Sequence, residues 1–475
     1  MALAAFIIIT EIVFVYSMAS AGMEFVLSSI AMTVALLIQL RFGMREGTPT
    51  PADIVVFIFN WLFLDLAPKI QLLSVPRTLV NTSTVVAEQV LITNLLCALF
   101  IVVYTVAYAL LTTRSRVEKV GPADAGPTGS AATPAPIRQF GIALTVFICF
   151  IVVGALGWTA YGTHDAVGLS PKDMIVKKFL LFLPSATLLT VLHETVRSQR
   201  KLLFSRVCVL LLLLLLVVAT ENPLTEKRNG LGPIYLSLIF ILFELRLRSQ
   251  NRRLLLLIAS MVVVFPAISV FTHNHRQILN GVDLSAIVDT LKDHYFSTHY
   301  DAWANIYTTV EMVQRQGIHW GQQLLGGVLF YVPSSLWHTK PLATGIAIGN
   351  YLIANYSMWF TNLSAPLIAE AYLDFGTIGV VIYALGLAWL VARTDRFASK
   401  GRKWSSFPLA VYGAFFLMFA LRGSLMIAFA YGTGGLLAFL AASAFLSAGS
   451  RPMGQRYFRQ EPPSFLPAHG TMPRG

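Results

Sequence analysis

Charged residues are scarce in this chain of 475 residues, and their scarcity excludes most soluble folds. Asp, Glu, Lys and Arg make up 12% of the residues, whereas hydrophobic residues make up 56%. A soluble domain normally carries about 25% charged residues and a smaller apolar share. We therefore expect one integral membrane domain instead of a water-soluble fold.

Motifs for cofactors and metals are missing too. No phosphate-binding loop, dinucleotide fingerprint, Asp-x-Asp pair or His-x-x-x-His cluster stands out. Cys97, Cys149 and Cys208 lie in apolar stretches without the spacing of a metal site or disulfide framework, so we interpret them as small buried hydrophobes. We predict that the protein uses no cofactor and no metal.

Long apolar runs recur along the whole chain, each able to cross about 30 Å of hydrocarbon as a helix. They predict an all-α, polytopic membrane protein with about twelve transmembrane helices. The predicted spans are residues 3–20, 23–40, 53–72, 89–112, 139–158, 178–196, 202–220, 231–245, 254–272, 366–392, 406–421 and 424–447. The span 231–245 is short and Gly230, Gly232 and Pro233 mark its start, which indicates a broken or partly re-entrant helix.

Basic residues predict the orientation of these spans, because cytoplasmic loops retain Lys and Arg. They concentrate in alternate segments, namely 41–52, 113–138, 197–206, 246–253, 393–403 and 451–475. Both termini are then expected inside. The net charge of +12 follows from this topology and from contact with membrane lipids, and we expect no nucleic acid partner.

The predicted organisation is one transmembrane domain, residues 1–448, with three special segments. Residues 113–138 have the Pro, Gly, Ala and Ser content of a flexible cytoplasmic linker, and 449–475 that of a disordered cytoplasmic tail. Residues 273–365 form a large extracytoplasmic loop before the last three helices. Loops of this length are usually functional.

This outer loop holds most of the nine histidines and half of the eight tryptophans of the chain. Aromatic faces mixed with His, Asn, Gln and Asp suit a sugar, whose C–H faces stack on rings while its hydroxyls need donors and acceptors. The alternative is an aromatic belt at the membrane surface. Within the loop we expect amphipathic helices at 283–293 and 301–315, and an apolar piece at 322–337 that dips into the membrane surface.

Charged groups near the outer side are costly to bury and therefore mark function or internal pairing. Arg228 precedes the Gly- and Pro-rich start of a helix, where a guanidinium and free N–H groups would bind a diphosphate. Arg422, in the last outer turn, is expected to meet Arg228. The alternative is that both arginines reach lipid headgroups or pair with Glu221 or Glu370.

The segment from Tyr331 to Gly379 resembles the signature region of bacterial oligosaccharide repeat unit polymerases, the Wzy-type O-antigen polymerases. Two strings carry the resemblance, YVPSSLWHTKP from Tyr331 and SAPLIAEAYLDFGTIGVV from Ser364. The matching positions are Pro333, Ser334, Leu336, Trp337, Lys340, Pro341, Glu370, Tyr372, Phe375, Gly376 and Gly379. Arg228 in its tight outer loop is similar to a family feature as well, and a weaker Arg-x10-Gly spacing runs from Arg315.

The resemblance implies a multi-pass glycosyltransferase of the bacterial inner membrane with a GT-C-like fold, used in O-antigen, capsule or exopolysaccharide synthesis. It implies that a growing glycan moves from undecaprenyl diphosphate to the terminal sugar of an incoming lipid-linked repeat unit. A repeat-unit flippase and a chain-length regulator are the implied protein partners.

Such a transfer needs cations for the leaving diphosphate and a base for the attacking hydroxyl. The predicted catalytic residues are Glu370, Arg228 and Arg422, with Glu370 as the base. The predicted substrate-binding residues are Lys340, Arg315, His319, Trp337, His338, Tyr372, Glu221 and Asp301, of which Glu221, His319 and Asp301 are also alternative bases. For Glu370 the alternative is a buried ion pair that holds two helices together.

Two other functions stay open at this point. An O-antigen ligase also has a large outer loop with Arg and His, but transfers glycan to lipid A core. A flippase or exporter of lipid-linked sugars would carry charges along a central cavity, whereas here they concentrate at the outer ends of the spans.

Overall fold

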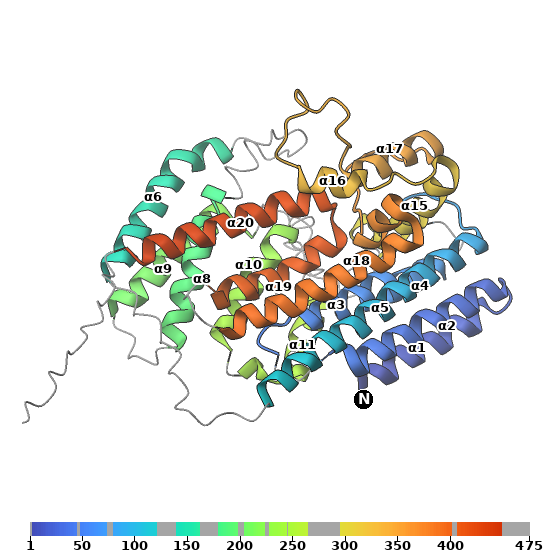
Figure 1. The fold of residues 1–475 in the computed structure, drawn as a ribbon, viewed down its shortest axis with the longest axis horizontal. Coiled ribbons are helices and arrows are strands. Elements are labelled where there is room, and N and C mark those ends of the chain that lie inside the picture. Colours follow the sequence, from blue (N-terminus) through green and yellow to red (C-terminus); the bar gives the residue numbers. More distant parts are fainter. Residues whose placement is uncertain are drawn as a thin grey trace, which may run out of the picture.

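The protein is described by a computed structural model that covers residues 2–44, 48–73, 79–120, 139–161, 179–197, 204–223, 228–244, 246–264, 295–400 and 406–448. The described residues contain helices and turns but no β-strand, so the all-α prediction is confirmed. Figure 1 shows most helices running in a similar direction, as a bundle.

The N-terminal helices form one side of the bundle. They are α1 (Ala2–Met18), α2 (Met23–Ile38) with η1 (Gln39–Gly43), α3 (Ala52–Trp61) with η2 (Leu62–Leu66) and α4 (Ala67–Leu72), and α5 (Ala87–Val120). Helix α2 packs between α1 and α5. Because α3 is buried along its whole length, apolar residues occupy nearly every position of this helix.

The middle of the chain supplies the opposite side of the bundle. Its elements are α6 (Gln139–Tyr161), α8 (Leu183–Arg197), α9 (Phe204–Thr220), α10 (Arg228–Leu242), η4 (Arg246–Arg248), α11 (Gln250–Ile258) and η5 (Ala259–Val264). Helix α10 packs against α8 and α19, and α11 packs against α3. The two sides of the bundle are thereby joined.

The last third of the chain carries both a helical cap and the centre of the bundle. The cap comprises η6 (Thr298–Tyr300), α15 (Ala302–Gln316), α16 (Gln322–Val328) and α17 (Thr344–Tyr356). The central helices are α18 (Leu367–Lys400), α19 (Ser406–Arg422) and α20 (Leu425–Leu446). Figure 1 shows α15, α16 and α17 together near one end of the bundle, which we call the outer end.

Five described helices are long and apolar enough to cross a membrane. They are residues Met23–Gly43, Ala87–Thr113, Gln139–Leu156, Leu367–Ser399 and Leu425–Leu446. Each predicted span overlaps a helix, and four further apolar helices are shorter. These features fit a multi-pass membrane protein, while the total of twelve spans, the orientation and the GT-C-like arrangement stay predictions.

Three expectations differ from the structure. Helix α5 continues to Val120, into the segment predicted as linker, because no Gly or Pro interrupts the sequence before Gly121; residues 121–138 lie outside the described part. Helix α10 is continuous from Arg228 and accommodates Pro233, so the expected break is not there. Cys208 is exposed on α9, whereas Cys97 and Cys149 are buried as predicted. The expected helix at 283–293 and the tail 449–475 lie outside the described residues.

Candidate functional site

Arg422 ends α19 at the outer end and turns toward the start of α15. One terminal nitrogen of its guanidinium lies 3.0 Å from Asp301 Oδ1 and donates to the Thr298 carbonyl at 2.8 Å. The Nε atom is buried and has no hydrogen-bond partner among the described residues. Arg422 is therefore anchored on one side and keeps an unused donor on another. The charged partner of Arg422 is thus Asp301, and the expected pairing with Glu221 or Glu370 is not what the structure shows.

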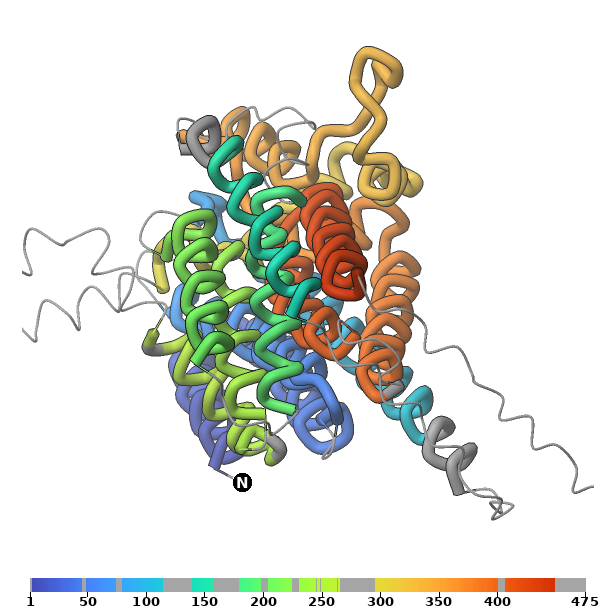
Figure 2. Tube along the Cα trace, turned by 90° about the vertical axis from the view of Figure 1, so that its left-hand side faces the viewer, coloured from blue at the N-terminus to red at the C-terminus, as the bar shows by residue number. Residues whose placement is uncertain are grey.

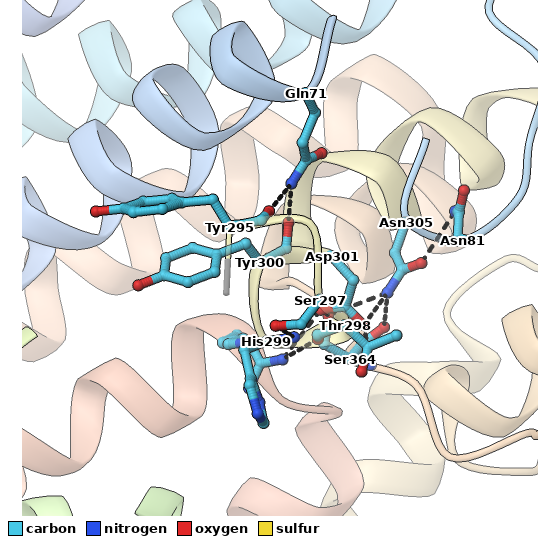
Figure 3. Close-up of polar contacts among 11 residues, drawn as sticks. Gln71, Asn81, Tyr295, Ser297, Thr298, His299, Tyr300, Asp301, Asn305 and Ser364 are labelled. Carbon is cyan, nitrogen blue, oxygen red and sulfur yellow. Dashed lines mark hydrogen bonds and ion pairs between the residues drawn. The ribbon is translucent and has the colours of Figure 1, made fainter. Parts of the chain in front are cut away.

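Asp301 collects neutral donors in addition to Arg422. Its carboxylate accepts from the Ser364 hydroxyl at 2.6 Å, the Ser364 backbone N–H at 3.3 Å and the Asn305 amide at 3.0 Å. Asn81 donates to the other end of the Asn305 side chain, as Figure 3 shows. A buried carboxylate needs such partners, since an unpaired charge away from water is costly.

Aromatic rings lie beside this pair. The rings of Phe63 and Tyr300 stack with centroids 5.3 Å apart, and Tyr295 stacks on Tyr300 at 4.7 Å. The Gln71 amide donates to the carbonyls of both tyrosines and so fixes η6 against α4 (Figure 3). The Arg422 guanidinium lies 6.0 Å from the centre of the Phe63 ring.

Glu370 lies in the first turn of α18 and is fully buried. Its Oε1 accepts from the Leu425 backbone N–H at 2.8 Å and from the Ser424 hydroxyl at 3.0 Å, so it caps the N-terminus of α20. Its Oε2 has no hydrogen-bond partner within the described part of the chain. A cap made by backbone and hydroxyl groups replaces the ion pair that was the alternative expectation.

The turn between α19 and α20 therefore connects two groups that the sequence singled out. Arg422 stands at its beginning, and the carboxylate of Glu370 binds its end at Leu425. Thr344 of α17 donates its backbone N–H to Ser424 at 3.3 Å, which ties the cap to the same turn. We call Arg422, Asp301, Asn305, Ser364, Glu370 and Ser424 the outer-end site.

A break in α18 positions the cap helix α16 next to this site. Gly376 has a φ of +61°, a conformation that glycine adopts without strain. The break leaves the Leu373 carbonyl free to accept from the His319 backbone N–H at 2.8 Å. Asp374 accepts from the backbone N–H groups of Gln323 and Leu324, both at 2.9 Å. Asp374 thus acts as an N-terminal cap of α16.

Lys340, Trp337 and His338 belong to a loop that projects from the bundle after α16 (Figures 1 and 2). The Lys340 ammonium donates to the carbonyls of Phe330 at 2.7 Å and Val332 at 2.9 Å. Desolvation lowers the pKa of Lys340. Trp337 donates to the Thr339 hydroxyl, and His338 is exposed. The positive charge of Lys340 is used inside the loop, and no described hydrogen bond links these residues to Arg422 or Glu370.

Arg315 forms a second cluster at the outer end. It lies 2.7 Å from Glu311, one turn earlier on α15, and its side chain is 56% exposed. The hydroxyls of Tyr351 and Tyr356 also donate to Glu311. Burial, followed by the hydrogen bond to Glu311, raises the pKa of both tyrosines. This cluster fastens α15 to α17.

The remaining predicted residues lie around the central helices. His319 is half-buried, and its Nδ1 has no hydrogen-bond partner among the described residues; Tyr372 is half-buried against the core. Glu221 is buried and lines a pocket. The other lining residues are Phe182, Gly230, Pro233, Tyr412, Phe416 and Tyr431. Arg228 begins α10, but its side chain lies outside the described part, so its meeting with Arg422 stays a prediction.

Sequence reasoning missed the uncharged members of the outer-end site. The cost of burying a charge singled out the charged members, but it does not apply to Ser364, Asn305 and Ser424. Hydroxyl and amide side chains are also common in loops, so they do not stand out there. Ser364 and Ser424 nevertheless stand next to the starts of predicted helices, where residues of this type cap backbone N–H groups. That position was the available signal.

Comparison with known proteins finds no matching family model, no matching curated protein and no matching solved structure. The fold itself defines the class: over its described residues the chain is all-helical, with five helices suited to crossing a membrane, as in a multi-pass membrane protein.

Proposed function

We propose that the chain polymerises undecaprenyl-diphosphate-linked oligosaccharide repeat units at the outer face of the bacterial inner membrane. The observation that carries the proposal is the turn between α19 and α20. It joins Arg422, whose buried Nε has no hydrogen-bond partner among the described residues, to the buried carboxylate of Glu370, whose Oε2 has none there either. A diphosphate leaving group needs the first group and an attacking hydroxyl needs the second.

The proposed step is a transfer at the anomeric carbon of the donor glycan. The bond from this carbon to the phosphate oxygen breaks, and its electron pair leaves with the lipid diphosphate. The acceptor hydroxyl oxygen forms the new bond to the same carbon, and its proton passes to Glu370. Arg422 stabilises the charge that develops on the diphosphate. Loss of the proton from Glu370 to water completes the cycle.

The surroundings of Arg422 support a sugar substrate. Asp301, Asn305 and Ser364 provide carboxylate, amide and hydroxyl groups within one hydrogen-bonded network. The stacked rings of Phe63 and Tyr300 adjoin it. Sugars are bound by this combination of polar groups and ring faces. The resemblance of the strings that contain Ser364 and Glu370 to repeat unit polymerases supports the same reaction.

The experiment is reconstitution of the purified full-length chain with a lipid-linked repeat unit, followed by electrophoresis of the products. We expect a ladder of polymers. Arg422→Ala should lower the rate by about 100-fold or more, as for loss of one donor to a developing anion. Arg393→Ala is the matched control, because Arg393 is an exposed arginine on α18 whose guanidinium lies over Trp389.

Two outcomes would contradict the proposal. Wild-type protein that makes no ladder excludes a polymerase, and an undiminished ladder from folded Arg422→Ala excludes this site. Cells that lack the protein separate the alternatives: a missing polymerase leaves single repeat units on the surface, a missing ligase leaves lipid-linked polymer, and a missing flippase leaves neither.

A further inference from the structure

Helix α16 and the loop after it expose an unusual amount of apolar surface. On α16, Leu325 and Val328 are each 49% exposed and lie three residues apart, on one face of the helix. In the loop, Tyr331 is 58%, Leu336 78% and Leu342 55% exposed. Figures 1 and 2 both show this loop projecting away from the bundle. These five residues are called the apolar face of the loop.

The opposite side of α16 is fixed on the outer end of α20. A Cβ on Gly326 would lie 2.6 Å from Pro341 and 3.0 Å from Met426, and one on Gly327 would lie 3.3 Å from Phe429. Because the two glycines allow this close approach, α16 has one orientation on α20. Its Leu325 and Val328 side chains are turned outward as a result.

The apolar face of the loop continues the exposed apolar surface of α20. Phe429, beneath Gly327, is itself 40% exposed, and Leu436 and Leu440 further along α20 are 43% and 49% exposed. Helix α20 is one of the five helices suited to crossing a membrane. Exposed leucines on a helix that crosses a membrane face lipid, and the exposed surface of α16 adjoins those of α20 at the outer end.

Several backbone groups of the loop are bonded within the loop, which lowers the cost of contact with lipid. Lys340 binds the carbonyls of Phe330 and Val332. Further turn bonds run from Val332 N–H to the Leu329 carbonyl and from Lys340 N–H to the Trp337 carbonyl. The one ammonium group of the loop is thus turned inward.

We propose that α16 and residues 329–342 form a membrane anchor whose apolar face sits in the boundary between lipid headgroups and acyl chains at the outer end. The occupant of this surface is the lipid leaflet beside α20. Tyr and Trp are enriched at that depth, which fits Tyr331 and Trp337. The anchor is independent of the proposed polymerase activity, and it would hold the adjoining α19–α20 turn at the level of lipid headgroups.

The test places a fluorophore on the loop and measures its surroundings. Cys97 and Cys149 are buried and Cys208 is exposed, so Cys208→Ala gives a background with no accessible thiol among the described residues. Leu336→Cys carries the label on the loop, and Gln314→Cys, an exposed polar position on α15, is the control. The labelled full-length protein is placed in phospholipid vesicles. Nitroxides on the lipid acyl chains and aqueous iodide then serve as two quenchers.

We expect acyl-chain nitroxides to quench the label at position 336, with iodide quenching several-fold weaker than at position 314. Equal iodide quenching at both positions overturns the proposal, because the loop then lies in water. Protection from both quenchers also overturns it, because protein then covers the loop. Leu342→Cys serves as a second loop position if Leu336→Cys fails to fold, with the same expected and contrary results.

Discussion

Two largely buried arginines at opposite ends of the central helices have different surroundings. Arg253 on α11 donates to the backbone carbonyls of Thr48, Thr50 and Leu247, and its guanidinium lies 5.2 Å from the Phe240 ring. Arg422 at the outer end shares its contacts between one carbonyl and Asp301, and its buried Nε has no partner within the part of the chain that the structure describes. Arg253 uses Nε and one terminal nitrogen to hold a loop in place, whereas the Nε of Arg422 makes no hydrogen bond to a described residue.

The difference teaches that burial of a cation alone does not mark a functional group. What separates the two arginines is unused hydrogen-bonding capacity close to other polar side chains. Asp395, near Arg253, accepts hydrogen bonds from Thr50 and Tyr108 on its two oxygens, while Oε2 of Glu370 at the outer end has no partner among the described residues. Substitutions at both ends of the bundle therefore test whether the Arg253 end is structural and the outer end functional.

The largest loss of stability is expected for Arg253→Ala. Its removal leaves three carbonyls without their donor and three nearby carboxylates, Asp53, Asp395 and Glu244, without this cation, which costs about 3–5 kcal/mol of unfolding free energy. Thermal unfolding in detergent measures the loss. Arg252→Ala is the control, because Arg252 is exposed and donates to one carbonyl. Equal melting temperatures of the two variants would show that the contacts of Arg253 do not stabilise the fold.

A similar loss is expected for Lys69→Met, which extends the comparison to a third buried cation. Lys69 lies 2.7 Å from Glu11 and 2.6 Å from Asp65, so its loss strands two buried carboxylates at a cost of about 3 kcal/mol or more. The triple variant Glu11→Gln, Asp65→Asn, Lys69→Met should recover much of this stability. If the triple variant melts no higher than the single one, the ion pairs are not the cause.

A smaller loss is expected for Ser364→Ala at the outer end. Asp301 loses one hydroxyl donor but keeps Arg422 and Asn305, so about 1–2 kcal/mol should be lost. Unfolding by denaturant measures it, with the exposed neighbour Asn362→Ala as control. A loss equal to that of Arg253→Ala would mean that the outer-end network is as structural as the other one.

The smallest effect is a pH dependence from Tyr307 on α15. Burial raises the pKa of this phenol to about 12, and its hydroxyl accepts from Val86 N–H and donates to the Thr84 carbonyl. An unfolded tyrosine titrates near pH ~10, so the folded state keeps a proton that the unfolded state loses. Stability from this group is complete below about pH 10 and falls between about pH 10 and 12. Tyr307→Phe should flatten the plot of melting temperature against pH in this range. An unchanged slope would contradict the raised pKa of Tyr307.

The sequence predicted the helices well, because the length of each apolar run and the polar segments that separate the runs are local properties of the chain. It also singled out Arg422, Glu370 and Asp301, since charges near membrane-crossing segments are costly. It did not predict that Arg422 pairs with Asp301, 121 residues earlier, because that contact depends on how α15, packed on α18 and α5, places Asp301 beside the end of α19.

Two further misses have physical reasons. Ser364 and Asn305 carry no charge, so nothing in their burial draws attention to them. Glu11, Asp65 and Lys69 lie within runs that are apolar on average. Asp65 and Lys69 are one helical turn apart, but the pairing of Lys69 with Glu11 depends on how α1 lies against α4 in space. Side-chain pairing between distant segments is set by tertiary packing, which periodicity does not encode.

The decisive measurement is the rate of glycan transfer by Glu370→Gln in the reconstituted ladder assay, at equal amounts of folded protein. The amide oxygen of Gln can still accept from Ser424 and Leu425, so the cap of α20 is kept while the proposed base is removed. We predict a fall of about 100-fold or more, in the range for loss of a general base. A rate within about three-fold of wild type would show that Glu370 is only a helix cap and that the chemistry lies elsewhere.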